Sequence, residues 1–315
     1  GQLVRRGFLQ ILGGQKLSDD ANGSGRLELS RWITSNDNPL FARVMVNRIW
    51  HYHFGRGIVK TTSDFGVRGA VPTHPELLDH LASYFAQQNW SVKQMHRYIM
   101  NSDAYMRQSS DIPASSEVDP NNDLFWRFNR QRLDAEQIRD TLLTLSHEID
   151  HSVGGRHPFD HRLTYFFRQH DPFVGVYPTN RRSIYMMQQR IVKNDYLDLF
   201  DGPDGNIQMS ERKVTTTTLQ ALFMMNSPFI YERSQKIAER LITDQTEPKD
   251  RAISAYRMVF GRVPTEQEVA QSTLFTQGAI ASLTDSGMKD TQADHAAWTS
   301  FIRGMISSNE FIYVD

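Results

Sequence analysis

Helix-start signatures recur along this 315-residue chain, and most are followed by apolar residues at helical spacing. A Ser, Thr, Asp or Asn before a helix accepts hydrogen bonds from backbone N–H groups that lack a partner within the helix, so these residues mark helix starts. After Asp134, for example, Ile138, Leu142, Leu145 and Ile149 follow at intervals of four, three and four residues, which places them on one helical face. Further signatures predict helices that begin at Asn38-Pro39, Thr73-His74-Pro75-Glu76, Ser91-Val92-Lys93-Gln94, Ser227-Pro228 and Thr265-Glu266-Gln267-Glu268. We also expect helices that begin at about Thr217, Lys249 and Ala293.

These segments predict a mainly α-helical, multi-helix globular assembly of about nine helices, with a small irregular insert that contains β structure. In the insert, helical periodicity gives way to Gly, Pro and aromatic residues. Its best strand candidate is Arg182–Met187, which we expect to pair with Leu163–Phe167. The expected regions are an irregular N-terminal segment (1–37), an N-terminal helical region (38–153), the insert (154–205) and a C-terminal helical region (206–315), and all four are compatible with one compact domain.

The composition excludes several functional classes. The chain contains no cysteine, which excludes disulfides, thiolate catalysis, iron–sulfur clusters and covalent haem attachment within it. Its 35 basic and 36 acidic residues leave a net charge of −1, so we expect no nucleic-acid partner. No run approaches the roughly 18 uncharged apolar residues of a membrane span, so we expect none.

Several longer motifs resemble those of one protein family. They are Asn38–Trp50, His53–Val59, Asp64–Gly66, Thr73–Leu78, Arg132–Glu136, Arg182–Tyr185, Asn226–Phe229 and Ser308–Phe311. Together they resemble the C-terminal domain of unknown function number fifteen fifty-three of planctomycete multidomain cytochrome-like proteins. The resemblance implies an extracytoplasmic location, c-type-cytochrome-like partner segments upstream in the same longer protein, haem in those segments only, and a link to polysaccharide. It implies no activity and no catalytic residue.

One string matches a zinc-protease pattern. His147, Glu148 and His151 satisfy H-E-x-x-H, and Gly154 and His157 extend the match to the H-E-x-x-H-x-x-G-x-x-H pattern of metzincins. On a helix, residues four apart share a face, so the three histidines would bind zinc and Glu148 would act as general base. In metzincins, however, a β-sheet precedes this helix, whereas the preceding residues here predict helices. The alternative is a solvated helix end with scattered histidines.

Two groups of polar residues are candidates for ligand binding. One lies on the helix predicted after Asn38, where directional donors suit a carboxylate, a sulfate or sugar hydroxyls and Trp50 would offer a stacking surface. The other surrounds Asp134 and suits an anion or an ion-pair network. For both groups the alternative is structural, with the side chains holding neighbouring loops together. The residues are Arg43, Asn47, Arg48 and His51 in the first group and Arg132, Asp134, Arg139 and Arg182 in the second.

The leading hypothesis is an extracytoplasmic binding or organising module of a multidomain, cytochrome-associated protein, which recognises an anionic polysaccharide or a partner domain. Two enzymatic alternatives stay open. One is a zinc-dependent hydrolase that uses the 147–157 string. The other is a metal-free carbohydrate-active enzyme whose cleft contains Arg43, Asn47 and His51.

Overall fold

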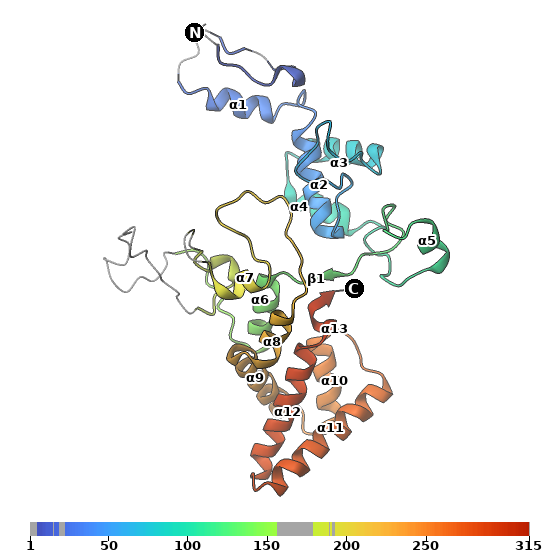
Figure 1. Ribbon diagram of the computed structural model, residues 1–315, viewed down its shortest axis with the longest axis vertical. Coiled ribbons are helices and arrows are strands. Elements are labelled where there is room, and N and C mark those ends of the chain that lie inside the picture. The colour runs from blue at the N-terminus through green and yellow to red at the C-terminus, as the bar shows by residue number, and fades with distance from the viewer. Residues whose placement is uncertain are drawn as a thin grey trace, which may run out of the picture. The chain divides into compact units, whose positions relative to one another are not determined.

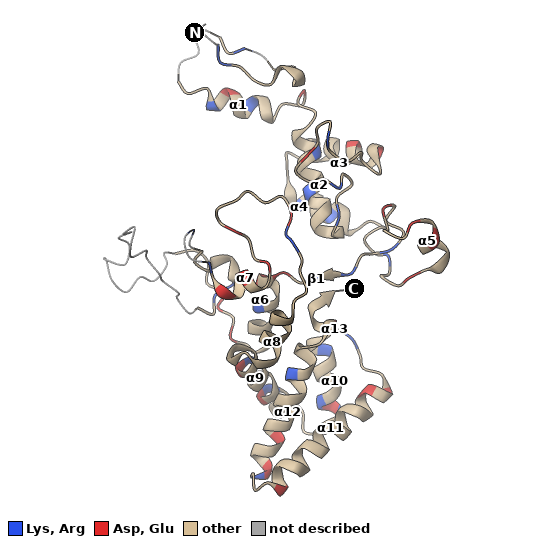
Figure 2. Cartoon of the chain, in the orientation of Figure 1, with Lys and Arg blue, Asp and Glu red and all other residues tan. Residues whose placement is uncertain are grey.

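A computed structural model describes residues 5–14, 16–18, 23–155, 179–188, 190 and 193–314. This part of the chain is mainly helical, as the sequence predicts. It forms two compact units, residues 1–131 (unit 1) and 132–314 (unit 2), so the boundary lies inside the expected 38–153 region. Basic and acidic residues are interspersed along both units (Figure 2). No helix in the described ranges is long and apolar enough to cross a bilayer.

Unit 1 is built around three helices that pack on one another, α2 (Phe41–Phe54), α3 (Pro75–Gln87) and α4 (Val92–Met100) (Figure 1). Their apolar faces and the loop residues Ile58, Val59 and Phe125 form its core. Three shorter elements are η1 (Gln10–Leu12), α1 (Arg26–Ile33) and α5 (Pro113–Val118). The α1 helix therefore lies in the 1–37 segment that was expected to be irregular.

The helix starts of unit 1 only partly follow the sequence signatures. Ser91 caps α4 as predicted, because its side chain accepts from the N–H of Gln94. Asn38 Oδ1 accepts hydrogen bonds from the N–H groups of Leu40 and Phe41. Because Phe41 is the first residue of α2, the helix begins slightly later than expected. The capping box predicted at Thr73 is not formed. The Thr73 hydroxyl donates to the carbonyl of Ile58 at 3.3 Å, and α3 begins without a side-chain cap.

Unit 2 surrounds a second apolar core, to which α6 (Ala135–Leu145) and the C-terminal helices contribute. The longest helices pack side by side, with α12 against both α9 and α11 (Figure 1). A two-stranded sheet pairs β1 (Gln131–Arg132) with β2 (Tyr313–Val314). The other helices are α7 (Asp195–Leu199), α8 (Thr218–Asn226), α9 (Pro228–Asp244), α10 (Pro248–Val259), α11 (Glu266–Asp285), α12 (Asp290–Ile306) and α13 (Asn309–Ile312).

Two predicted caps of unit 2, Asp134 and Thr265, are confirmed. Each forms a reciprocal capping box with the residue three positions later, at the starts of α6 and α11, and Thr217, where a helix was expected to begin, forms a third box at the start of α8. Each box satisfies two backbone N–H groups at a helix start, so it fixes where the helix begins.

The predicted strand at Arg182–Met187 is wrong. Ser183–Tyr185 form a 3₁₀ turn, η3, because polar groups of α6 hold this backbone. The N–H of Ser183 donates to both carboxylate oxygens of Asp140, at 2.9 and 3.1 Å. Leu163–Phe167, which was expected to pair with this strand, lies outside the described residues.

Candidate functional site

Asn47 is a structural residue. Its side chain is fully buried in unit 1, where Nδ2 donates to the carbonyl of Val59 at 2.9 Å and Oδ1 accepts from the N–H of Val59 at 2.8 Å. A Cβ atom on Gly57 would lie within 3.0 Å of the Asn47 amide, so glycine is required for this close approach. The amide therefore fastens the loop after α2 to the middle of that helix.

Trp50 does not offer the stacking surface that was expected of it. Trp50 is only 4% exposed, and its ring stacks on Phe54 with centroids 4.2 Å apart, inside the core of unit 1. Arg48 and His51 are half-buried on the same helix. Of the predicted α2 residues, Arg43 is the one that lines a cavity described here.

The cavity at Arg43 lies between the loop before α2, α2 itself and α3, and has a volume of about 310 Å³. Arg43 Nε donates to Asp79 Oδ1 at 2.7 Å, and Nη1 donates to the carbonyl of Pro39. We call this cavity the α2–α3 pocket. Its walls are formed by Ser35, Asn36, Asn38, Pro39, Ala42, Arg43, Asp79, Ala82, Ser83, Ala86, Gln87 and Trp90.

Trp90 supplies the aromatic wall that was expected from Trp50. Its φ is +60°, which is uncommon for a bulky side chain. Packing against Phe41 and Phe85, with ring centroids 5.3 and 5.4 Å away, holds the ring there. Trp90 was not predicted from the sequence, because it follows α3 outside any helical pattern. Asp79 was missed as well, although it lies four residues before Ser83 on the same face of α3.

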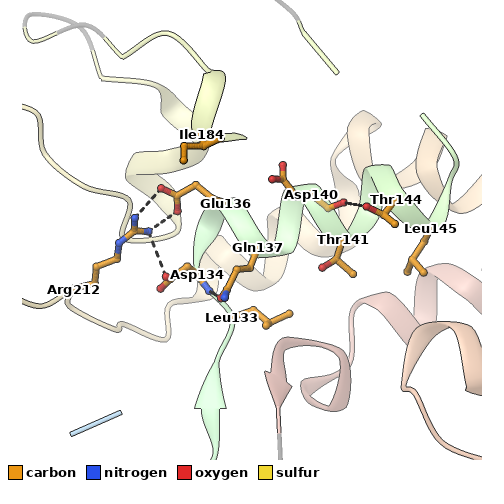
Figure 3. Close-up of a pocket in the computed structure, with 10 residues that line it drawn as sticks. All are labelled: Leu133, Asp134, Glu136, Gln137, Asp140, Thr141, Thr144, Leu145, Ile184 and Arg212. Carbon is orange, nitrogen blue, oxygen red and sulfur yellow. Dashed lines mark hydrogen bonds and ion pairs between the residues drawn. The ribbon is translucent and has the colours of Figure 1, made fainter. Parts of the chain in front are cut away.

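The second cavity, which we call the α6 groove, runs along α6 in unit 2 and has a volume of about 620 Å³. Arg212 binds Glu136 through two hydrogen bonds, one of them 2.8 Å long, and lies 3.7 Å from Asp134 (Figure 3). These charges occupy the N-terminal end of α6, and Thr144 and Leu145 lie at the other end. The lining residues are Leu133, Asp134, Glu136, Gln137, Asp140, Thr141, Thr144, Leu145, Ile184 and Arg212.

Three acidic residues and one arginine line the groove. Arg212 pairs with Glu136 and Asp134, whereas Asp140 is held by Ser183 and Arg139. Burial raises the pKa of Asp134, and the attraction of Arg212 offsets this only in part. Burial also opposes ionisation of Glu136, but the hydrogen bond from Arg212 lowers the pKa of that carboxyl. Asp134 was predicted as a site residue, whereas Arg212 was missed because it comes from a loop 76 residues after Glu136.

The remaining predicted arginines of unit 2 bind neighbouring segments of the chain, and Arg132 and Arg139 do so through backbone carbonyls. Arg132 lies 3.3 Å from Asp201 and donates to the carbonyl of Thr215. Arg139 donates to the Ser183 hydroxyl at 3.1 Å and to the carbonyls of Arg181, at 2.9 Å, and Thr179. Arg182 contacts the ring and hydroxyl of Tyr185. These contacts favour the structural alternative for this group.

The zinc-protease string is not presented on a helix. The α6 helix ends at Leu145, and His147 has a φ of +57°, so the expected helical spacing of His147 and His151 is wrong. Glu148 Oε2 lies 2.9 Å from Arg233 Nε, so the predicted general base is in an ion pair. His157 lies outside the described residues, and the three-histidine zinc site therefore stays a prediction.

Comparison with known proteins identifies one family. A model described as PSD1, a protein of unknown function (DUF1553), matches residues 25–276, which confirms the resemblance found in the sequence motifs. No curated protein and no solved structure matches the chain.

Proposed function

The chain belongs to the DUF1553 family, and we propose that it is a binding module that recognises an anionic saccharide through the α2–α3 pocket. The observation that carries this proposal is the composition of the pocket wall. Hydroxyl and amide groups, one arginine paired with one aspartate, and one tryptophan surround a cavity of about 310 Å³. Sugar hydroxyls need such paired donors and acceptors, and the C–H face of a sugar ring packs on an aromatic side chain.

Arg43 is the group that would bind the anionic part of the ligand. Its ion pair with Asp79 is partly solvated, because the two side chains are 33% and 58% exposed. Exposed pairs of this kind contribute only about 0–1 kcal/mol. A carboxylate or sulfate can therefore take the place of Asp79 at little cost, and the planar guanidinium can bind it through two hydrogen bonds.

The strained backbone at Trp90 supports the same site. Residues in sparsely populated φ/ψ regions concentrate at ligand-binding positions, where the surrounding structure holds them. Asn89 and Trp90 both have positive φ, and Trp90 lines the pocket. The turn therefore presents a fixed aromatic wall before any ligand arrives.

The organising part of the proposal concerns the cellular context. We propose that the chain acts outside the cytoplasm, beside c-type-cytochrome-like segments of the same longer protein that hold the haem. The family resemblance supports this part. Asn47 and Arg139 each hydrogen-bond to a backbone carbonyl of a neighbouring segment, which supports a structural role for these two residues.

Calorimetric titration with glycans tests the proposal. We expect a sulfated or carboxylated oligosaccharide to bind and its neutral counterpart to bind more weakly. Arg43→Ala should weaken binding of the charged glycan by about tenfold, which is the loss of one charge-assisted contact. Gln87→Ala should weaken binding of both glycans, because Gln87 lines the pocket.

Arg97→Ala is the matched control, since Arg97 is exposed on α4 and lies outside the pocket. It should bind both glycans as the unchanged protein does. Equal affinities of the Arg43 and Arg97 variants would refute the site. Thermal melting of each variant shows whether a loss of binding comes from a loss of folding.

A further inference from the structure

Two backbone N–H groups at the start of α2 have no hydrogen-bond partner among the described residues. Asn38 Oδ1 accepts from the N–H of Phe41, the first helical residue, and the N–H of Val44 donates to a carbonyl one turn earlier. The N–H groups of Ala42 and Arg43 lie between these two and are left over. Such groups point out of the N-terminal end of a helix, where they can bind an acceptor.

The side chain of Asn38 adds another unused donor at the same helix start. Asn38 is only 9% exposed, and it lines the α2–α3 pocket. Because Oδ1 accepts from two backbone N–H groups, this oxygen must face the helix, and Nδ2 is the atom of the amide that is left over. Nδ2 donates to no group in the described part of the chain. A buried donor without an acceptor costs free energy, so this atom favours a ligand oxygen.

The charges at this helix start favour an anion. The N-terminal end of a helix carries a partial positive charge, and the first turn of α2 contains no acidic residue. Arg43 adds a full positive charge, since its guanidinium reaches back to the carbonyl of Pro39, before the helix. Asp79 pairs with Nε of this guanidinium, whereas Nη2 donates to none of the described residues. An anion at the start of α2 is therefore attracted by the helix and by Arg43 together.

We propose that the anionic group of the saccharide is a sulfate ester, bound at the N-terminal end of α2. A sulfate ester presents one more terminal oxygen than a carboxylate does, so it can accept from more of the unused donors. Its oxygens accept from the N–H groups of Ala42 and Arg43, from Asn38 Nδ2 and from the Arg43 guanidinium. This inference rests on the proposed function and deepens it, because it names the acidic group and the residues that bind it.

Asn38→Asp is the variant that tests the site. Aspartate caps a helix as well as asparagine does, so α2 stays intact, but a carboxylate oxygen replaces the Nδ2 donor and repels an anion. In calorimetric titrations of the full chain with glucose 6-sulfate, glucuronate and glucose, we expect glucose 6-sulfate to bind most tightly. Asn38→Asp should weaken its binding by more than about tenfold. Asn194→Asp makes the same change at the cap of α7, outside the pocket, and should bind it as the unchanged protein does.

Nuclear magnetic resonance of the backbone amides gives a second measurement. Glucose 6-sulfate should shift the amide signals of Ala42 and Arg43 and leave those of α9 in place. The inference fails if glucuronate binds as tightly as glucose 6-sulfate, if the Asn38 and Asn194 variants have equal affinity, or if the two amide signals do not shift. In each of these cases, binding of a charged sugar that Arg43→Ala weakens would still support the proposed function. If neither charged sugar binds, the proposed function and the inference both fail.

Discussion

At the scale of single residues, buried amides in this protein hold backbone segments in place. Asn47→Ala would remove both hydrogen bonds to Val59 and leave a buried N–H and C=O without partners. We expect a loss of about 2–4 kcal/mol in the free energy of unfolding, measured by urea titration. The exposed Arg97→Ala variant should change it by less than about 0.5 kcal/mol. Equal urea midpoints for the two variants would show that the amide contributes nothing.

A pair of histidines gives unit 1 a dependence on pH. His53 Nε2 and His96 Nδ1 are 2.7 Å apart, and the ring of Tyr105 lies edge-on to His53. Burial and then repulsion from His96 lower the pKa of His53 below its ordinary 6.5. The unfolded chain therefore takes up this proton at higher pH than the folded chain does.

Stability should consequently fall as the pH drops through 6.5 toward the lower pKa of folded His53. His53→Gln should make the melting temperature of unit 1 less sensitive to acid between about pH 7 and about pH 5. His151→Gln, at an exposed position, should leave the sensitivity unchanged. An unaltered pH dependence in the His53 variant would contradict the assignment.

The sequence identified the right residue types at these positions but not their partners. Asn47 and Arg139 were expected to bind a ligand, and both instead bind backbone groups. The sequence alone cannot distinguish a residue that binds a ligand from one that binds the backbone, because a ligand oxygen and a backbone carbonyl accept the same hydrogen bond. The partner of Arg139 at Arg181 is 42 residues away, in a segment with no helical pattern.

At the scale of elements, the capping boxes set where helices begin. The Thr265 hydroxyl accepts from the N–H of Glu268 at the start of α11. Thr265→Ala should destabilise unit 2 by about 1 kcal/mol. Thr273→Ala is the matched control, because the Thr273 hydroxyl donates within the same helix to the carbonyl of Val269. Thermal melts in which both variants lose equal stability would contradict the capping role.

Helices were more predictable than the insert for a physical reason. A cap and an apolar stripe are local, so Asp134, Thr217 and Thr265 mark their helices without any tertiary information. The turn at Ser183 depends on Asp140, 43 residues earlier, which holds its N–H and hydroxyl. An apolar run such as Ile184-Tyr185-Met186 therefore looks like a strand when read alone.

At the scale of the whole molecule, the chain divides between Gln131 and Arg132 into two units, and no core cluster of the described residues draws on both units. This division could not be predicted from the sequence, because no linker rich in Gly, Pro or Ser marks it and the family motif Arg132–Glu136 begins there. Each core is drawn from one continuous stretch of chain. The two candidate sites also lie in separate units.

Separate cores predict that damage to one unit stays within it. Ile237 is fully buried in the core of unit 2, so Ile237→Ala should destabilise that unit by about 2–5 kcal/mol. Hydrogen exchange should then accelerate in α9 and α12 while α2 and α3 keep their protection, and Asn47→Ala should produce the reverse pattern. Because the two residues belong to different units, we expect the double variant to show the sum of the two effects. Loss of protection in both units from either single substitution would mean that the chain unfolds as one cooperative body.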